Sequence, residues 1–172
     1  MLGAKELAIA WGDNPQHWYW RSYPGGSRFA EVAELQWVCW LEIRGKLEMR
    51  LLSPNTFYAA YLVIKFKQDV YGFDYEPVTA NIEVVGRVGG SNSVWCSKNR
   101  QIHLSPNGGQ GHHFARKRGD GWMEVEMGHF YNGELEDGES REVHMSVLET
   151  ERLGAKYGLI VQGMEVRPKV DT

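Results

Sequence analysis

The chain has 172 residues and a formal net charge of -3, which argues against a protein whose main task is to coat nucleic acid, because such proteins carry a basic surplus. Hydrophobic residues make up 42% of the chain and charged residues 24%, a balance that excludes intrinsic disorder. No apolar run approaches the length of a membrane span and no signal-peptide pattern opens the chain, so we expect no membrane insertion. One domain covering residues 1–172 is the simplest organisation for this length.

The first structured stretch, "AWGDNPQHWYW", is rich in aromatic residues. Trp11, Trp18 and Trp20, three of the seven tryptophans, lie on both sides of a turn at residues 12–15. Trp11 ends a predicted first strand, "ELAIAW", so a core position and an exposed one are about equally expected for it. Trp18 follows two polar residues, so we expect its ring to be exposed, and one of the alternating Tyr19 and Trp20 should face the core. Such a cluster is typical of a site for flat, weakly polar rings.

The next segment, "SRFAEVAEL" (27–35), predicts one short helix with Ser27 as its N-cap. "WVCWLEI" then indicates a buried strand. It continues into "LEIRGKLEMRLL" (41–52), whose strict alternation predicts a half-buried antiparallel strand with a charged solvent face. Gly45 falls on the apolar face of this strand and predicts a bulge or bend.

Five later segments predict further strands between turns rich in Gly, Pro and Asn; they cover residues 57–67, 75–86, 121–131, 142–149 and 158–168. "FYAAYLVIKFK" (57–67) is apolar on both faces, as a central strand is. Residues 105–121 are polar and glycine-rich and predict a long exposed loop. With seven to ten strands, the predicted fold is all-β: a β-sandwich of jelly-roll type with one short helix.

The two cysteines, Cys39 and Cys96, form neither a CxxC pair nor a disulfide framework, and we expect free thiols. Cys96 lies in "SVWCSKN", near a predicted loop, and a link between chains is its alternative role. The adjacent His112 and His113 have no third residue at metal-ligand spacing, so no metal or other cofactor is expected.

Glu142 and Glu149 flank the predicted strand "VHMSVLE". Seven positions separate them, so a regular strand puts them on opposite faces, and they share a site only if a bulge or a strand end intervenes. A glycosidase using this pair would need the carboxyl groups roughly 5.5 Å or 6.5–9.5 Å apart. Nothing else in the sequence indicates catalysis, and we expect no enzyme.

Six ordered blocks resemble the phloem protein 2 (Nictaba-like) family of plant lectins, from about Glu6 to Lys169: "WGDNPQHWYW", "EVAEL", "VCWLEIRGK", "LSPNTFYAAYLVIKF", "DGWMEVEMGHFYN" and "GLIVQGMEVRPK". The resemblance implies a jelly-roll sandwich, binding of N-acetylglucosamine oligomers (chitooligosaccharides) and N-glycan cores, and a homodimer. Two tryptophans around the first turn and two glutamates bind sugar in the family pattern. They fall on Trp11, Trp18, Glu142 and Glu149.

The chain also departs from the family pattern. A lysine run for nuclear import is replaced by "SKNRQIH", so we expect a location in the cytoplasm or phloem sap (sieve elements) rather than the nucleus. Many members carry an N-terminal F-box segment, whereas about five residues precede the first predicted strand, which gives no support for a ubiquitin-ligase adaptor. The alternative function is an RNA- or protein-binding phloem transport or defence factor that uses the basic residues 116–118, with steeply salt-dependent binding.

Overall fold

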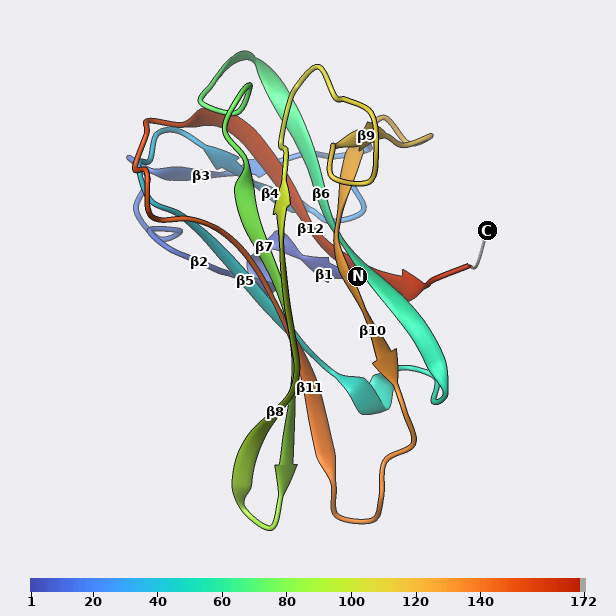
Figure 1. Cartoon of the computed structure of the whole chain (residues 1–172). Coiled ribbons are helices and arrows are strands. Elements are labelled where there is room, and N and C mark those ends of the chain that lie inside the picture. Colours follow the sequence, from blue (N-terminus) through green and yellow to red (C-terminus); the bar gives the residue numbers. More distant parts are fainter. Residues whose placement is uncertain (171–172) are drawn as a thin grey trace.

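A computed structural model describes residues 1–170, which form two antiparallel β-sheets packed face to face (Figure 1). Sheet A has the order β3 (Trp18–Ser22), β4 (Glu31–Leu35), β12 (Tyr157–Pro168), β6 (Thr56–Tyr71), β10 (Met123–Asn132), β9 (Arg116–Lys117), with β1 (Leu2–Gly3) paired to β12. Sheet B has the order β2 (Ala8–Ile9), β5 (Leu41–Glu48), β11 (Ser140–Glu149), β7 (Val78–Val88), β8 (Ser91–Ile102). Two 3-10 turns complete the elements, η1 (Ala4–Glu6) and η2 (Met49–Leu51).

The topology is that of a jelly roll, as the sequence predicts. Four strands of sheet A, in the order β4-β12-β6-β10, face four strands of sheet B, in the order β5-β11-β7-β8. Of these eight strands, only β7 and β8 follow each other within one sheet, and every other connection crosses to the opposite sheet. This wrapping is what distinguishes a jelly roll from a sandwich of simple hairpins.

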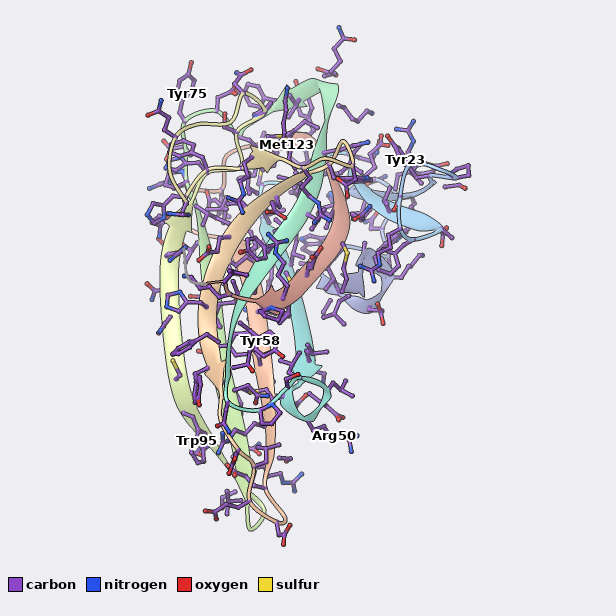
Figure 2. The ribbon with its side chains drawn as sticks, turned by 90° about the vertical axis from the view of Figure 1, so that its right-hand side faces the viewer. Tyr23, Arg50, Tyr58, Tyr75, Trp95 and Met123 are labelled. Atoms are coloured by element: carbon purple, nitrogen blue, oxygen red, sulfur yellow. The ribbon has the colours of Figure 1, made fainter. Side chains whose placement is uncertain are left out.

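The connections divide between the two ends of the sandwich (Figure 1). We call one end the loop end; it gathers the connections 10–17, 36–40, 72–77, 103–115 and 150–156. The opposite end carries η2, the β7–β8 hairpin tip and the connection 133–139. Figure 2 shows Tyr75 at the loop end, with Trp95 and Arg50 at the opposite end.

The core lies between the two sheets, and the alternation in β5 and β7 predicts it correctly. Leu41 and Ile43 of β5 face Val78, Ala80 and other apolar side chains of the inner layer. β6 is apolar on both faces because its outer side is covered as well. There, a second buried cluster forms under Met1 and Tyr23; its members are Val32, Val63, Trp122 and Ile160.

The predicted helix at residues 27–35 is wrong. Residues Glu31–Leu35 form β4, which pairs with β3 and β12. Ser27 does not cap a helix; its hydroxyl instead accepts a hydrogen bond from the amide of Phe29 at 3.1 Å. Sheet pairing on both sides outweighs the local preference, because a helix this short is marginal without tertiary support.

Two smaller expectations also differ from the structure. Gly45 lies in unbroken register opposite Met145, without a bulge, and a Cβ there would lie 2.9 Å from Leu7 Cδ2, so its role is close packing. Cys96 lies within strand β8 rather than near a loop. Both cysteines are free thiols within the chain, as expected. Among residues 1–170, no helix is long and apolar enough to cross a membrane.

Ion pairs cover the outer face of sheet A near β9. Glu124 is buried, and it accepts hydrogen bonds from Arg167 Nη2 at 2.6 Å and Arg116 Nη2 at 3.0 Å. Arg118 donates to Glu165 at 2.9 Å. Burial alone would raise the pKa of Glu124, but the hydrogen bonds from Arg167 and Arg116 outweigh it and hold the pKa below its ordinary value.

This network predicts a loss of stability in acid. A carboxyl group with a lowered pKa in the folded state stabilises the fold above its unfolded pKa of about 4.5, and that contribution is lost as the pH falls below this value. Glu124→Gln should cost about 2 kcal/mol at pH 7 and reduce the loss of stability between pH 6 and pH 3. Urea unfolding across this range measures both effects. Glu151→Gln, at an exposed position, is the control; an unchanged pH slope in Glu124→Gln would contradict the prediction.

Candidate functional site

Trp11 lies in the first turn of the loop end, beyond the short strand β2, with its side chain 54% exposed. Its backbone has a φ of +64°, a conformation that residues other than glycine rarely adopt. The turn is fixed by hydrogen bonds from Gly12 N to Ile9 O at 2.9 Å and from Trp20 Nε1 to Gly12 O at 2.8 Å. A strained backbone that presents a large apolar ring to water is a feature that clusters at functional sites.

Trp18 is buried, at 2% exposure, so the expectation that its ring is exposed is wrong. The amides of His17 and Trp18 both donate to Asn14 O, which ends the turn and starts β3 directly at Trp18. Trp18 and Trp20 then face inward while Tyr19 faces solvent, which confirms that one of that pair packs against the core. The polar residues before Trp18 belong to the turn, so they carry no information about which face of β3 it takes.

Because Trp18 is buried in the core, we predict that Trp18→Ala lowers the free energy of unfolding by about 3–5 kcal/mol, as for other buried large aromatics. Urea denaturation followed by far-UV circular dichroism measures this. A folded Trp18→Ala protein with wild-type stability would contradict the burial.

Two further tryptophans of the loop end were not identified from the sequence. Trp37 and Trp40 lie in the β4–β5 connection and are about half exposed, because strand β5 begins only at Leu41. The stretch "WVCWLEI" resembles a continuous apolar strand, so the sequence does not indicate that these two rings are exposed. With Trp11 they make up the group that we call the loop-end tryptophans.

Hydrogen bonds join the two connections that carry the loop-end tryptophans. The ring of His17 lies 5.6 Å from that of Trp11, and its Nδ1 donates to Trp37 O at 2.8 Å. Trp40 Nε1 donates to Glu42 Oε2 at 2.8 Å, and the amide of Ala10 donates to Glu42 O at 3.0 Å. The three indoles are thus held on adjoining loops.

Glu42 is an ionised acceptor beside these rings. Hydrogen bonds from Arg44 and from Trp40 hold its pKa below its ordinary value. Arg44 Nε lies 2.7 Å from Glu42 Oε1. A half-buried carboxylate next to indole rings can accept hydrogen bonds from hydroxyl groups that lie against those rings.

A pocket of about 430 Å³, which we call the loop-end pocket, lies between the β6–β7 and β11–β12 connections. Tyr75 is 90% exposed on its wall, and Tyr71 stacks on Tyr157 with ring centroids 5.6 Å apart. Glu76 and Arg152, which form an ion pair, also line it. The pocket therefore combines aromatic walls with charged hydrogen-bonding groups, the composition of many small-ligand sites.

Glu149 lies at the edge of this pocket but is largely buried, and its oxygens are already engaged. Its Oε2 accepts hydrogen bonds from the backbone amides of Glu151 at 3.0 Å and Arg152 at 3.2 Å. Its Oε1 lies 3.7 Å from the buried ammonium of Lys156. Lys156 Nζ also donates to Gly154 O at 2.7 Å. Glu149 thus fixes the β11–β12 connection.

Glu142 lies at the other end of β11, far from the loop-end tryptophans. The pairing of β11 is regular along its length, so Glu142 and Glu149 take opposite faces and are separated by about 23 Å. This agrees with the alternation in the sequence and excludes the spacing that a glycosidase pair requires. Of the four predicted residues, the structure brings Trp11, Trp18 and Glu149 to the loop end and leaves Glu142 outside it.

The burial of Glu149 predicts a large effect on stability. Glu149→Ala leaves the Lys156 ammonium buried without a carboxylate and should cost about 3–5 kcal/mol. Hydrogen exchange at the amides of Glu151 and Arg152 should accelerate in the same variant. Glu142→Ala, on the same strand but half exposed, is the control and should change stability by less than about 0.5 kcal/mol. Equal effects from the two variants would contradict the structural role of Glu149.

The basic residues 116–118 are less available than the sequence suggested. Arg116 pairs with Glu124, and Arg118 pairs with Asp120 and Glu165. Most of their charge is neutralised within the fold, which weakens the case for a phosphate-binding loop. Within residues 1–170, no group of three His, Cys, Asp or Glu side chains is placed to hold a metal ion.

The family model of phloem protein 2 matches residues 1–168. The chain therefore belongs to the phloem protein 2 family, a non-catalytic family of lectin-like domains, in agreement with the expectation that it is not an enzyme. Its jelly-roll architecture agrees with the fold that the resemblance implied.

Two relatives are from Arabidopsis thaliana. F-box protein PP2-B10 is 44% identical over 98% of this chain and 59% of its own length, and the putative F-box protein PP2-B12 is 46% identical over 98% and 61%. The chain thus spans about half to two thirds of the curated relatives that it matches. Among solved structures, TmCBM61 in complex with β-1,4-galactotriose aligns with a TM-score of 0.41 at 10% identity, covering 95% of this chain and 87% of that one; this likeness is too distant to bear on function.

Proposed function

We propose that the loop end binds N-acetylglucosamine oligomers, with chitooligosaccharides and the cores of N-glycans as ligands, and carries out no catalysis. The observation that supports this most directly is the exposed ring of Trp11, held by a strained turn beside Trp37 and Trp40. Sugar rings present apolar C–H faces, and an indole is the largest platform that a protein can offer them. The methyl group of an N-acetyl substituent suits the same apolar surface.

The polar groups around the rings suit the hydroxyl rims of the sugar. Glu42 beside Trp40 and the Glu76–Arg152 pair in the loop-end pocket supply charged acceptors and donors. Hydrogen bonds to charged groups are about twice as strong as neutral ones. Because water competes at so open a surface, we expect an affinity in the micromolar range, about -8 kcal/mol per site.

Trp18 and Glu149 have positioning roles in this proposal. Trp18 packs into the core at the point where the turn that presents Trp11 ends, and Glu149 fixes the connection that forms one wall of the loop-end pocket. Glu142 has no part in the loop-end site, because it lies at the opposite end of β11.

Trp11→Ala should lower the affinity for chitotriose at least tenfold, because the ring stacks on the sugar in this proposal. The protein should stay folded, because the ring is exposed and does not pack in the core. Isothermal titration calorimetry with chitotriose, beside an equal concentration of mannotriose, measures this. The matched control is Trp95→Ala, whose ring is 53% exposed at the opposite end of the sandwich, and it should bind like wild type.

Unchanged chitotriose affinity in Trp11→Ala, or an equal loss in Trp95→Ala, would overturn the assignment of the site. Binding of both sugars with equal affinity would overturn the specificity for N-acetylglucosamine. The proposal is supported if wild type releases binding heat with chitotriose but not with mannotriose, and if Trp11→Ala abolishes that heat.

The relatives named as F-box proteins extend the proposal to longer chains. In such a protein, the domain described here would select glycan-bearing targets through its loop end. A homodimer would join two such sites and raise the apparent affinity for branched glycans. The location in cytoplasm or phloem sap stays a prediction.

A further inference from the structure

The outer face of sheet B carries a shallow groove of about 620 Å³ that lies away from the loop-end tryptophans. Its lining comes from β5, β11, β7 and β8, with Glu6 and Ala8 at one side. Since side chains alternate along a strand, each of these four strands sends every second residue to this face.

The pairing register aligns these outward side chains in three rows across the sheet, about 6.7 Å apart. From the loop end outward, the rows are Glu42, Leu148, Thr79 and Gln101; then Arg44, Ser146, Asn81 and Asn99; then Lys46, His144, Glu83 and Ser97.

The low part of the groove lies at Ser146, Asn81 and Asn99 of the middle row, because these three side chains are short; Arg44, at the end of the row, lies at the rim. Ser146 is buried, and its hydroxyl lies 3.3 Å from Asn81 Nδ2. Asn99 is exposed on the edge strand β8. Amides and hydroxyls that both donate and accept hydrogen bonds therefore line the floor.

The groove is continuous with the loop end. A further depression of about 380 Å³ shares Asn81 and Leu148 with the groove, and it shares Glu149 and Arg152 with the loop-end pocket. One chain-like ligand can therefore extend from the loop end along the outer face of sheet B.

The chemistry of the groove fits a neutral, hydroxyl-rich chain. Glu6 and Glu83 offset Lys46 and Arg44 at its rim, so it lacks the basic surplus that a nucleic acid needs. An extended peptide would instead add to a sheet edge, where free backbone groups are available, rather than to a sheet face.

We propose that this groove is an extended subsite that binds the later units of a long oligosaccharide whose first units occupy the loop end. The inference rests on the proposed function, and it adds a second site with Asn81 and Asn99 as its main hydrogen-bonding residues.

The test compares chitotriose with chitohexaose by calorimetry. Wild type should bind the hexamer about tenfold more tightly, because the added sugar units form further hydrogen bonds with the groove. Asn81→Ala/Asn99→Ala should bind chitotriose like wild type but lose most of this gain. The single variant Asn99→Ala, at an exposed position, provides the same test if the double variant is unstable. Asn92→Ala, exposed near the other end of β8, is the control and should keep the gain.

The possible results separate this inference from the proposed function. Chitotriose binding without a gain for the hexamer, or a gain that survives both asparagine variants, would overturn the groove and leave the loop end intact. No binding of either sugar by wild type would overturn both. Displacement of bound chitohexaose by an oligonucleotide, with steep salt dependence, would also overturn the choice of a neutral ligand.

Discussion

The buried ion pair between Glu149 and Lys156 is the constraint on which the geometry of the loop end depends. Lys156 exchanges backbone hydrogen bonds with Val38, at 3.0 and 2.8 Å, so the β11–β12 connection lies against the β4–β5 connection that carries Trp37 and Trp40. Removing two charges from water costs several kcal/mol, which the pairing offsets only because the carboxylate and ammonium also bond to backbone groups. The pair therefore fixes the positions of two loops that the strands alone leave free.

The two outer faces of the sandwich have different surfaces, and this difference limits where a ligand can bind. Sheet A is covered by a second apolar cluster, by Tyr23 over that cluster, and by the arginine–glutamate network around Glu124. Lys65 adds a cation over the ring of Trp122, at 4.7 Å from its centroid. Donors and acceptors on that face largely satisfy one another. On sheet B, Asn81 donates to Ser146 and Gln101 donates to Thr79. Each side-chain amide has further donors and acceptors, and Asn99 is exposed, so this face can still form hydrogen bonds with a partner.

The fold could be predicted from sequence where burial follows a simple period. β5 alternates along nearly its full length, and β6 is apolar on both faces because both are covered, so each pattern predicts its strand. The prediction for Glu31–Leu35 is wrong because their pattern fits a helix and a strand equally. These residues form a strand because they pair with β12, more than 120 residues later in the chain. The edge strand β8 is not predicted, because nearly every residue of it is exposed and its sequence therefore shows no alternation of polar and apolar residues.

The candidate site could be predicted only in part, because exposure in loops depends on contacts between distant segments. The spacing of Glu142 and Glu149 correctly predicts opposite faces, since strand geometry alone decides it. The exposure of Trp11 and the burial of Trp18 depend on where one turn ends. Asn14 O sets that end, because it accepts hydrogen bonds from two backbone amides. The fold would gain stability by burying the Trp11 ring or relaxing its backbone, and it does neither. A ring kept exposed at this cost is best explained by a ligand that covers it.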